Sequence, residues 1–312
     1  MTLIQLEYII AVDNFRHFAK AADSCFVTQP TLSMQIQKLE DQLGAIIFDR
    51  NKHPIEPTTI GKKIIAQARI AVHEAKRIDE IISDEKKEIS GELRLGIIPT
   101  IAPYVLPLFI NDFIDANPTV KLRVIELTSE NLVAQLKNDA IDVGIMVTPL
   151  GDGDIIEKPI FYEEFMCYMN HRHPLFGKEI LTIDDIGYDD LWILNEGHCF
   201  RNQVLNICHP NPAQKSNKKF VFESGSLEGL RKIVDQHGGL TLLPELATLD
   251  MSQTEKSKLK RFDDPRPIRE VSIVIKKSFL KQKLVEALYH SVSKTIPGYI
   301  HSEKNGKVIK WK

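Results

Sequence analysis

The stretch between Gly61 and Gly91 contains no proline or glycine, and this limits the possible folds more than any other feature of the sequence. Apolar residues recur in it at spacings of 4, 3, 4, 3 and 4, at Ile64, Ala68, Ala71, Ala75, Ile78 and Ile82. This heptad stripe predicts a continuous helix, and about 30 helical residues would extend about 45 Å. A single small domain cannot cover a stripe of that length. We therefore expect a linker helix over 59–89 that separates two domains and pairs with a copy of itself; a helix packed on its own chain is the alternative.

Residues 1–58 show the pattern of a small helical domain. Apolar residues share one face in 6–12 and again in 18–22, which predicts two short helices. A third helix is expected over 29–43, because Pro30 suits a first helical turn and Gly44 suits a helix end. Its apolar face is formed by Leu32, Ile36, Leu39 and Leu43, and its opposite face carries Gln29, Thr31, Ser33, Met34, Gln37 and Lys38. The following segment, "IIFDRNKHPIEPTTIG", predicts two short strands joined by a turn.

The polar face of the third helix has two interpretations from periodicity alone: a solvated surface, or a surface that reads the major groove of DNA. Charge does not favour the second, because the chain has a formal net charge of −2 and its first 66 residues hold seven basic and seven acidic side chains. However, "HFAKAADSCFVTQPTLSMQIQKLEDQLGAIIFDR" resembles the winged helix-turn-helix of LysR-type transcriptional regulators. The resemblance implies that Arg50 contacts the DNA backbone and that the residues facing DNA are Gln29, Pro30, Thr31, Ser33 and Lys38.

From residue 90 onward, strands alternate with helices. The order strand, helix, strand, helix, strand over 92–148 predicts a parallel sheet, with Thr100 and Ser129 at the turns after its first two strands, where ligands commonly bind. This region resembles the two-lobed effector domain of LysR-type regulators, which is similar to periplasmic binding proteins. The lobes are expected at about 90–162 plus 268–300 and at 163–267, and residues 301–312 are expected to be a basic tail. The predicted fold class is therefore α/β, with a winged helix-turn-helix, a long linker helix and a two-lobed effector domain.

The sequence also limits the location and the ligands of the protein. The N-terminus lacks the charged region of a secretory signal, and the longest apolar stretch, 95–110, is broken by prolines, so we expect a cytoplasmic protein without a membrane span. Four cysteines are too few for a disulfide framework in 312 residues, and Cys25 and Cys167 are expected to be buried and unreactive. No C-x-x-C occurs and the ten histidines are scattered, so neither a metal site nor a cofactor is expected.

The other two cysteines lie in "LNEGHCFRNQVLNICHP". Phe200, Val204 and Ile207 recur at spacings of 4 and 3, which predicts a short amphipathic helix that begins near Cys199 and ends near Cys208. Helical geometry would place the two α-carbons about 13 Å apart along the axis, whereas a disulfide needs them within about 7 Å. A bond between these cysteines would therefore require part of the helix to unwind.

The residues around Cys199 favour a reactive thiolate. A helix N-terminus, His198 and Arg201 would each stabilise the anion. Donors for the departing oxygen of a peroxide are available among His198, Arg201, Asn202, Thr100 and Ser129. Structural interpretations stay open: His198 could cap the helix, Arg201 could pair with an acidic neighbour, and Cys208 could be a core residue.

This segment carries a closer resemblance. Gly197-His198-Cys199, Arg201 and Cys208, together with "GIIPTIAPYVLP" and "SLEGLRKIV", resemble the peroxide-sensing members of the LysR family. The resemblance implies that peroxide oxidises Cys199 and that Cys208 then forms a disulfide with it. It also implies a pocket that uses Thr100, Ser129 and His198.

Two residues depart from the pattern of those members, since Asn202 and Ser129 stand where they commonly have aspartate and threonine. The favoured function is a transcription activator, not an enzyme, whose disulfide changes its oligomer arrangement and its operator contacts. Its expected partners are double-stranded operator DNA, RNA polymerase, hydrogen peroxide as signal, and copies of itself in a homotetramer built from linker-helix dimers. Two alternatives are a LysR-type regulator that binds a small organic effector between its lobes, and a thiol peroxidase, in which the DNA-reading unit would have no purpose.

Overall fold

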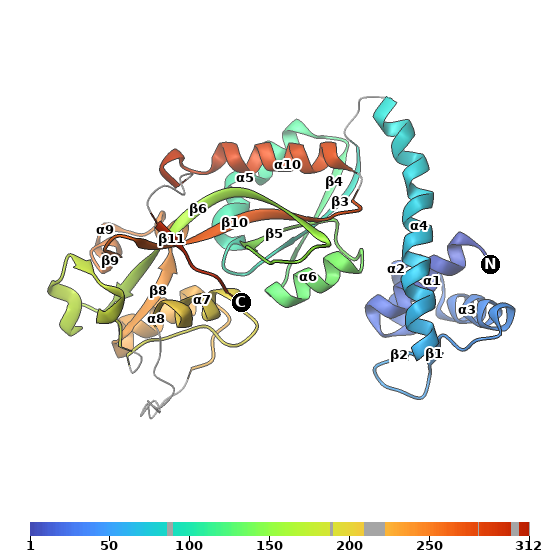
Figure 1. Ribbon diagram of the computed structural model, residues 1–312, viewed down its shortest axis with the longest axis horizontal. Helices are drawn as coiled ribbons and strands as arrows, with labels where there is room; N and C mark the ends of the chain where they lie inside the picture. Colours follow the sequence, from blue (N-terminus) through green and yellow to red (C-terminus); the bar gives the residue numbers. More distant parts are fainter. Residues whose placement is uncertain (86–89, 188–189, 209–221, 280, 301–305, 312) are drawn as a thin grey trace. The chain divides into compact units, whose positions relative to one another are not determined.

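The computed structural model forms two compact units, made of residues 1–88 with 138–140 and of residues 89–137 with 141–312. It describes all residues except 86–89, 188–189, 209–221, 280, 301–305 and 312. The first unit contains the helices and the hairpin near the N-terminus, and the second contains the α/β region (Figure 1).

The first unit has the elements of a winged helix-turn-helix followed by a long helix. These are α1 (Leu3–Phe15), α2 (Phe18–Ser24), α3 (Gln29–Leu43), β1 (Phe48–Asp49), β2 (Glu56–Pro57) and α4 (Thr59–Glu85). β1 and β2 pair antiparallel, which confirms the predicted hairpin. At the start of α3, the Thr28 hydroxyl accepts a hydrogen bond from the Thr31 amide at 3.4 Å. Gly44 ends the helix at φ 63°, a left-handed conformation that glycine adopts without steric cost.

The apolar face of α3 is buried except at its end. Leu32, Ile36 and Leu39 pack in the core with α1 and α2, as predicted. Leu43 is 40% exposed, which the periodicity did not predict, because the last turn of α3 extends beyond that core.

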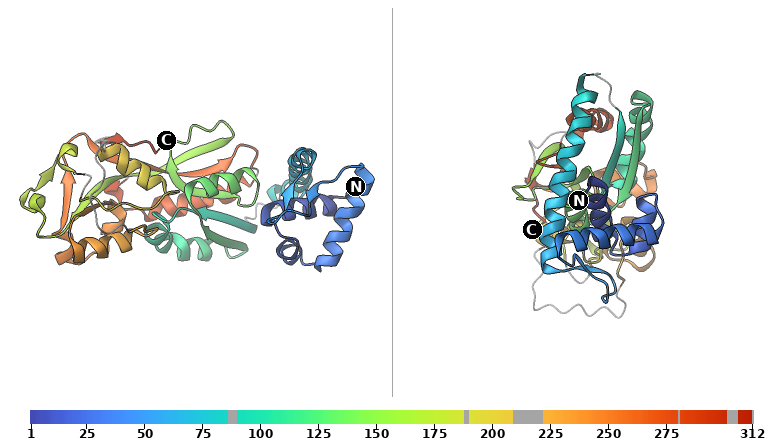
Figure 2. Two further views of the ribbon diagram at one scale, coloured as in Figure 1. Left: turned by 90° about the horizontal axis from the view of Figure 1, so that it is seen from below. Right: turned by 90° about the vertical axis from the view of Figure 1, so that its right-hand side faces the viewer.

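The first half of α4 packs against its own unit. Ile65, Ala68 and Val72 belong to the core formed with α1–α3, so the heptad stripe is covered by its own chain at Ala68. Further along, α4 extends beyond α1–α3, as the right-hand view of Figure 2 shows, and Ile78 is 64% exposed. Self-pairing therefore stays a prediction for the second half of the helix.

A sheet with the strand order β4-β3-β5-β10-β6-β9-β7 runs through the second unit. Its strands are β3 (Gly91–Ile97), β4 (Val120–Glu126), β5 (Val143–Thr148), β6 (Ile155–Met169), β7 (Ile180–Leu181), β8 (Leu240–Pro244), β9 (Leu259–Phe262), β10 (Arg266–Lys276) and β11 (Gly306–Val308), of which β8 pairs with β6 and β11 with β10. β3 pairs in parallel with β4 and β5, as the alternation of strands and helices predicted. β10 returns antiparallel between β5 and β6.

The helices of this unit cover the sheet in two lobes, which the long strands β6 and β10 connect. The helices and 3-10 turns are α5 (Ala102–Ala116), α6 (Ser129–Lys137), η1 (Pro174–Gly177), η2 (Ile183–Asp185), α7 (Cys199–Cys208), α8 (Leu227–His237), η3 (Glu245–Thr248), α9 (Gln253–Lys256), α10 (Gln282–Thr295) and η4 (Gly298–Ile300). In the first lobe α5 packs against α10, and α6 packs against β5 and β10. In the second lobe the end of β6 pairs with β8. Each lobe has its own buried apolar cluster.

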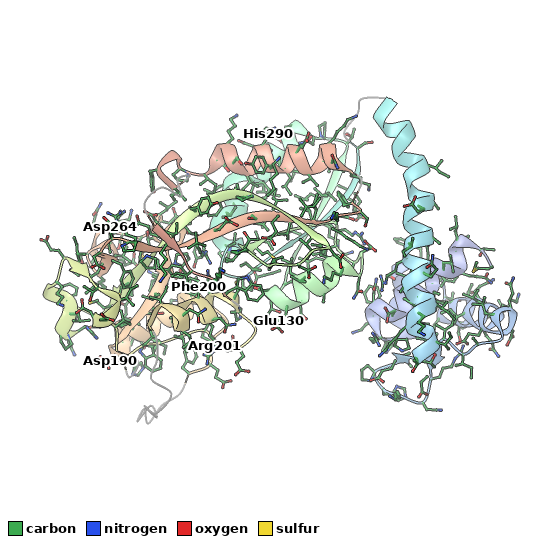
Figure 3. The ribbon with its side chains drawn as sticks, in the orientation of Figure 1. Glu130, Asp190, Phe200, Arg201, Asp264 and His290 are labelled. Carbon is green, nitrogen blue, oxygen red and sulfur yellow. The ribbon has the colours of Figure 1, made fainter. Side chains whose placement is uncertain are left out.

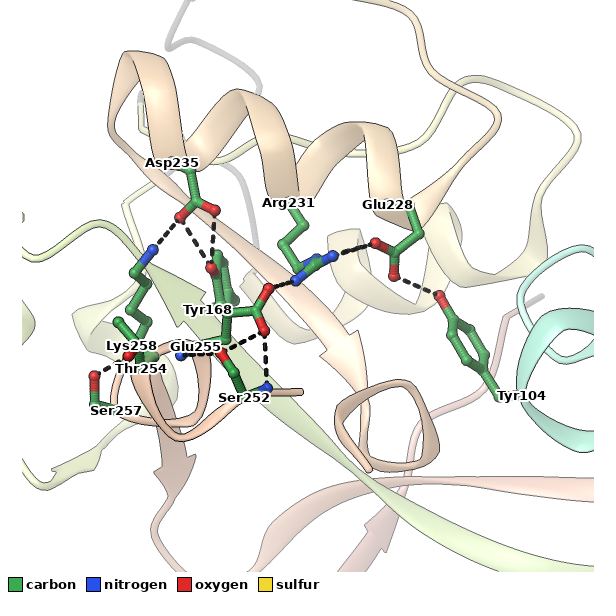
Figure 4. A network of polar contacts seen from close by, with 10 residues as sticks. All are labelled: Tyr104, Tyr168, Glu228, Arg231, Asp235, Ser252, Thr254, Glu255, Ser257 and Lys258. Carbon is green, nitrogen blue, oxygen red and sulfur yellow. Dashed lines mark hydrogen bonds and ion pairs between the residues drawn. The ribbon is translucent and has the colours of Figure 1, made fainter. Parts of the chain in front are cut away.

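Polar side chains link the two lobes (Figure 4). Tyr104 of α5 donates a hydrogen bond to Glu228 of α8 at 3.5 Å, and Arg231 of α8 forms ion pairs with Glu228, at 2.6 Å, and with Glu255 of α9. Burial and the negative charge of Glu228 raise the pKa of Tyr104, so its hydroxyl keeps its proton and remains a donor. The Tyr104–Glu228 hydrogen bond joins α5 of the first lobe to α8 of the second, and Arg231 connects α8 to α9 within the second lobe.

A basic tail was expected over 301–312; residues 301–305 and 312 lie outside the described part of the chain, and residues 306–311 differ from the expectation. Residues 306–308 form β11, which pairs in parallel with β10, and Ile309 and Trp311 are 6% and 4% exposed. The expectation considered only the lysines of "GKVIKWK", but apolar residues lie between them. The apolar side chains pack inward while Lys307 and Lys310 stay exposed.

Candidate functional site

The candidate DNA-binding surface is the polar side of α3. Gln29, Pro30 and Lys38 are exposed, and Thr31 and Ser33 are half-buried. The helix thus brings the five predicted residues together on one element. Their contact with DNA stays a prediction.

Arg50 of the hairpin is anchored to α3. Its guanidinium forms an ion pair with Glu40 at 3.2 Å and donates a hydrogen bond to the Ser33 hydroxyl at 3.3 Å. Glu40 also accepts hydrogen bonds from the backbone amides of Ile47 and Phe48, at 2.7 and 3.2 Å. This carboxylate, which sequence reasoning did not identify, therefore positions a cation beside a hydroxyl on the surface where a phosphate group is expected.

The candidate redox site lies at the start of α7. Cys199 is the first residue of this helix, is 2% exposed and packs in the apolar cluster of the first lobe. Burial raises the pKa of its thiol; the Ser129 hydroxyl, the positive charge of Arg269 and the backbone amides of Phe200 and Cys199 oppose the rise. The thiol is therefore mostly protonated near neutral pH, but its neighbours are groups that stabilise a negative charge.

Arg269 of β10 supplies the positive charge of this pocket, and sequence reasoning did not identify it. Its side chain is 1% exposed and forms an ion pair with Glu163 of β6 at 2.7 Å. It also donates hydrogen bonds to the hydroxyl and to the backbone oxygen of Thr100, both at 3.1 Å, and its guanidinium lies 5.3 Å from the centre of the Phe200 ring. A buried charge needs such partners to offset its lost hydration. The signal was present in the sequence, because Glu163 and Arg269 interrupt two strands that are otherwise rich in apolar residues, and the strands pair in register at these positions.

Thr100, Ser129 and His198, the predicted pocket residues, are all buried. The Ser129 hydroxyl lies close enough to Cys199 to oppose the rise of its pKa, yet it makes no hydrogen bond of normal geometry with any described residue. Burial lowers the pKa of His198, against the opposite effect of Glu126, so its imidazole is neutral near pH 7. A neutral imidazole can contribute hydrogen bonds to the site but no positive charge.

Arg201 and Asn202 donate hydrogen bonds to backbone oxygens. Arg201 donates a hydrogen bond to the backbone oxygen of Leu194 at 2.8 Å, and the Asn202 side chain donates to that of Trp311 at 3.2 Å. Phe200 is buried and Arg201 is half-buried; Figure 3 labels both. Arg201 is two residues after Cys199, and side chains two residues apart on a helix point to nearly opposite sides. This explains why the Arg201 guanidinium does not face the Cys199 thiol. The structure therefore gives these two residues other contacts than the expected donation to a peroxide.

Cys208 lies at the other end of α7 and packs against the cluster of the second lobe. Burial raises the pKa of its thiol to about 12. The buried Cys167 belongs to the same cluster, and its pKa is raised by burial and by the nearby Cys208. All four cysteines are free, and Cys199 and Cys208 are separated by the length of a ten-residue helix, about 13 Å along its axis. This confirms the helix that was predicted between them.

In the part of the chain that the structure describes, no three His, Cys, Asp or Glu side chains are arranged to bind a metal ion. None of the described helices is long and apolar enough to cross a membrane.

Both units match family models. Residues 3–62 match the family of bacterial regulatory helix-turn-helix proteins of the lysR type, and residues 86–295 match the LysR substrate binding domain. Among curated proteins, the chain is 33% identical to a hydrogen peroxide-inducible genes activator of Haemophilus influenzae, over 97% of this chain and 100% of that one. It is 32% identical to the DNA-binding transcriptional dual regulator OxyR of Escherichia coli, over 96% of this chain and 97% of that one.

Solved structures give the same relatives. A full-length OxyR variant from Pseudomonas aeruginosa is similar with a TM-score of 0.78 and 33% identity, covering 94% of this chain and 98% of that chain. A hydrogen peroxide-bound OxyR mutant from Corynebacterium glutamicum is similar with a TM-score of 0.60 and 26% identity, covering 94% and 92%. The likeness therefore extends over both units of the chain.

Proposed function

The chain belongs to the LysR family of bacterial transcriptional regulators, and from this premise we propose that it binds operator DNA and senses hydrogen peroxide through Cys199 and Cys208. The relatives support the signal, since one is named a hydrogen peroxide-inducible genes activator and a similar solved structure is an OxyR mutant with hydrogen peroxide bound. The observation that carries the proposal is the surroundings of Cys199. This buried thiol at a helix start lies beside a hydroxyl with unused hydrogen-bonding capacity and near a buried cation.

In the first step, the thiolate of Cys199 attacks one oxygen of hydrogen peroxide. The S–O bond forms as the O–O bond breaks, and the departing hydroxide takes a proton and leaves as water, so that the sulfur becomes a sulfenic acid. The Ser129 hydroxyl and the Arg269 guanidinium, held by Thr100, bind the peroxide and stabilise the negative charge that develops on the departing oxygen.

In the second step, the thiolate of Cys208 attacks the sulfur of Cys199. The S–S bond forms as the S–O bond breaks, and a second water leaves. Overall, two thiols are oxidised and one peroxide is reduced to two waters. Closing a loop of about ten residues costs little chain entropy, about 3 kcal/mol, whereas exposing a buried side chain such as Val204 costs about 1.5–3 kcal/mol. Both terms oppose the disulfide, so they favour its return to two thiols when a thiol reductant is present.

Unwinding of α7 would couple the disulfide to DNA binding. We propose that it changes how effector domains pair in a homotetramer, and thereby the spacing of the recognition helices and the contacts with RNA polymerase. The second half of α4, where Ile78 is exposed, is the surface that would form the dimer. Two recognition helices joined in this way suit two half-sites at a fixed spacing.

The experiment that tests the proposal is a mass map of the cysteines after peroxide treatment of the full-length protein. We expect the wild type and Cys167→Ser to form the Cys199–Cys208 bond, and Cys208→Ser to stop at a sulfenic acid on Cys199. Cys199→Ser should not react. If Cys199→Ser consumed peroxide at the wild-type rate, the sensor assignment would be wrong, and an organic effector bound between the lobes would be the better explanation.

A further inference from the structure

The C-terminal segment, residues 306–311, contacts both lobes. β11 continues the pairing of β10, and the Ile309 amide donates a hydrogen bond to the Ile268 oxygen at 2.9 Å. The side chain of Ile309 belongs to the apolar cluster of the second lobe, and that of Trp311 belongs to the cluster of the first lobe, which also contains Cys199. The segment is thus a built part of the effector unit.

Three side chains of α7 bind this segment. Asn202 donates to the backbone oxygen of Trp311 at 3.2 Å, Gln203 to that of Ile309 at 2.6 Å, and Asn206 to that of Lys310 at 2.8 Å. Gln203 is fully buried, so its bond is shielded from water. Three consecutive carbonyl groups of the segment therefore accept hydrogen bonds from one helix.

All three donors lie between Cys199 and Cys208. On the helix, Asn202 and Asn206 are one turn apart, about 6 Å along the axis. A disulfide must shorten the distance between the two cysteine α-carbons from about 13 Å to less than about 7 Å. The intervening helix cannot unwind that far and keep all three amides on their carbonyl groups.

We propose that residues 306–311 are a strap that positions α7 in the reduced protein, holds Cys199 away from Cys208, and is released when the disulfide forms. This inference rests on the proposed function, because it needs hydrogen peroxide as the oxidant and the Cys199–Cys208 bond as the product. The strap binds the helical form and not the unwound form, so it shifts the equilibrium toward the two thiols. Its release also frees Trp311 from the cluster that contains Cys199.

The hydrogen bond to the Trp311 oxygen explains why an amide side chain suits position 202. An aspartate at this position would place a carboxylate against the Trp311 oxygen and could not donate the hydrogen bond while ionised. Asn202→Asp should therefore weaken the strap without removing any part of it.

Gly306 offers a second means of releasing the strap. A Cβ at this position would lie 2.4 Å from the side-chain Cγ2 of Ile268 and 2.8 Å from the backbone oxygen of Arg266, so one or both strands would have to move. Gly306→Val should therefore push β11 away from β10. The exposed Lys307, in the same strand, provides the matched control Lys307→Ala.

Fluorescence of Trp311 tests release directly. The chain has two tryptophans, so full-length Trp192→Phe reports on Trp311 alone. After peroxide, we expect its emission to shift to longer wavelength and its quenching by acrylamide to increase, at the rate at which the mass map shows the Cys199–Cys208 bond. Adding Cys208→Ser should abolish the change. If the bond forms and Trp311 emission stays constant, the strap is wrong while the proposed function stands; if no bond forms, both are wrong.

The second measurement is the midpoint potential of the Cys199–Cys208 disulfide, determined by equilibration with a dithiol buffer. Asn202→Asp, Gln203→Met and Gly306→Val should each favour the disulfide, by about tenfold in the equilibrium constant for Gly306→Val, which corresponds to a midpoint potential about 30 mV more negative. Lys307→Ala should match the wild type. Circular dichroism establishes that each variant is folded, and the two substitutions in α7 test the strap even if Gly306→Val does not fold. Midpoints equal to the wild type in all three variants would overturn the inference.

Discussion

Replacing Arg269 by methionine tests whether its charge assists Cys199. The substitution removes the ion pair with Glu163 at 2.7 Å and both hydrogen bonds to Thr100, in a place where the two charged side chains are 1% and 0% exposed. Removing one partner of a buried ion pair costs about 3–5 kcal/mol, because the other charge is left without compensation. Arg269→Met alone should therefore lower the free energy of unfolding in urea by about that amount, and its reactivity could not be separated from its instability.

The double variant Arg269→Met, Glu163→Gln separates the two effects. A glutamine at 163 carries no charge and its oxygen can still accept the hydrogen bond that the Leu246 amide donates to Glu163 at 2.9 Å, so most of the lost stability should return. The pKa of Cys199 should rise further, because the cation that opposes the effect of burial is gone. Each unit by which the pKa rises lowers the thiolate fraction about tenfold.

Stopped-flow measurement of peroxide consumption at pH 7 provides the readout. The folded double variant should react at least about tenfold more slowly than the wild type. Arg201→Met is the matched control, since that guanidinium donates to the Leu194 oxygen, and it should keep the wild-type rate. A folded double variant that reacts as fast as the wild type would refute the role given to Arg269.

The remaining predictions concern pH, DNA and assembly. Because burial raises the pKa of Cys199, the thiolate fraction grows as pH rises, so the rate with peroxide should increase about tenfold from about pH 6.5 to about pH 7.5; a plateau below neutral pH would mean that the pKa is lowered instead. Ser33→Ala and Lys38→Ala should weaken operator binding measured by fluorescence anisotropy, and Lys38→Ala should also reduce the slope of log K against log salt by about 1, whereas unchanged binding for both would remove α3 as the recognition helix. Ile78→Glu should dissociate the pairs formed through α4, and a light-scattering mass equal to that of the wild type would contradict pairing through α4.

The parts of the fold that follow from local patterns could be predicted from the sequence. The helix over 29–43 is an example, because Pro30, the apolar spacing and Gly44 all act within one segment. The helix between Cys199 and Cys208 is another. Leu43 shows the limit of periodicity, because a stripe states which face is apolar but not where the covering core ends.

The site was less predictable because it depends on contacts between distant segments. Arg269 reaches Thr100 across 169 positions of the chain, and a single sequence does not state which strands become neighbours. The strap was not predicted for a related reason. The basic residues of 301–312 suggested a solvated tail, and the two apolar side chains that pack inward, Ile309 and Trp311, were given no weight. Lysines at exposed positions carry no information about the residues between them.

The most direct measurement of the central claim is a footprint of the full-length protein on operator DNA before and after peroxide. The wild-type footprint should change in extent or spacing when the Cys199–Cys208 bond forms, and a thiol reductant should restore it. Cys199→Ser should bind the same DNA with a footprint that peroxide does not alter. A footprint of Cys199→Ser that changes like that of the wild type, or a wild-type footprint that stays constant while the disulfide forms, would contradict the account.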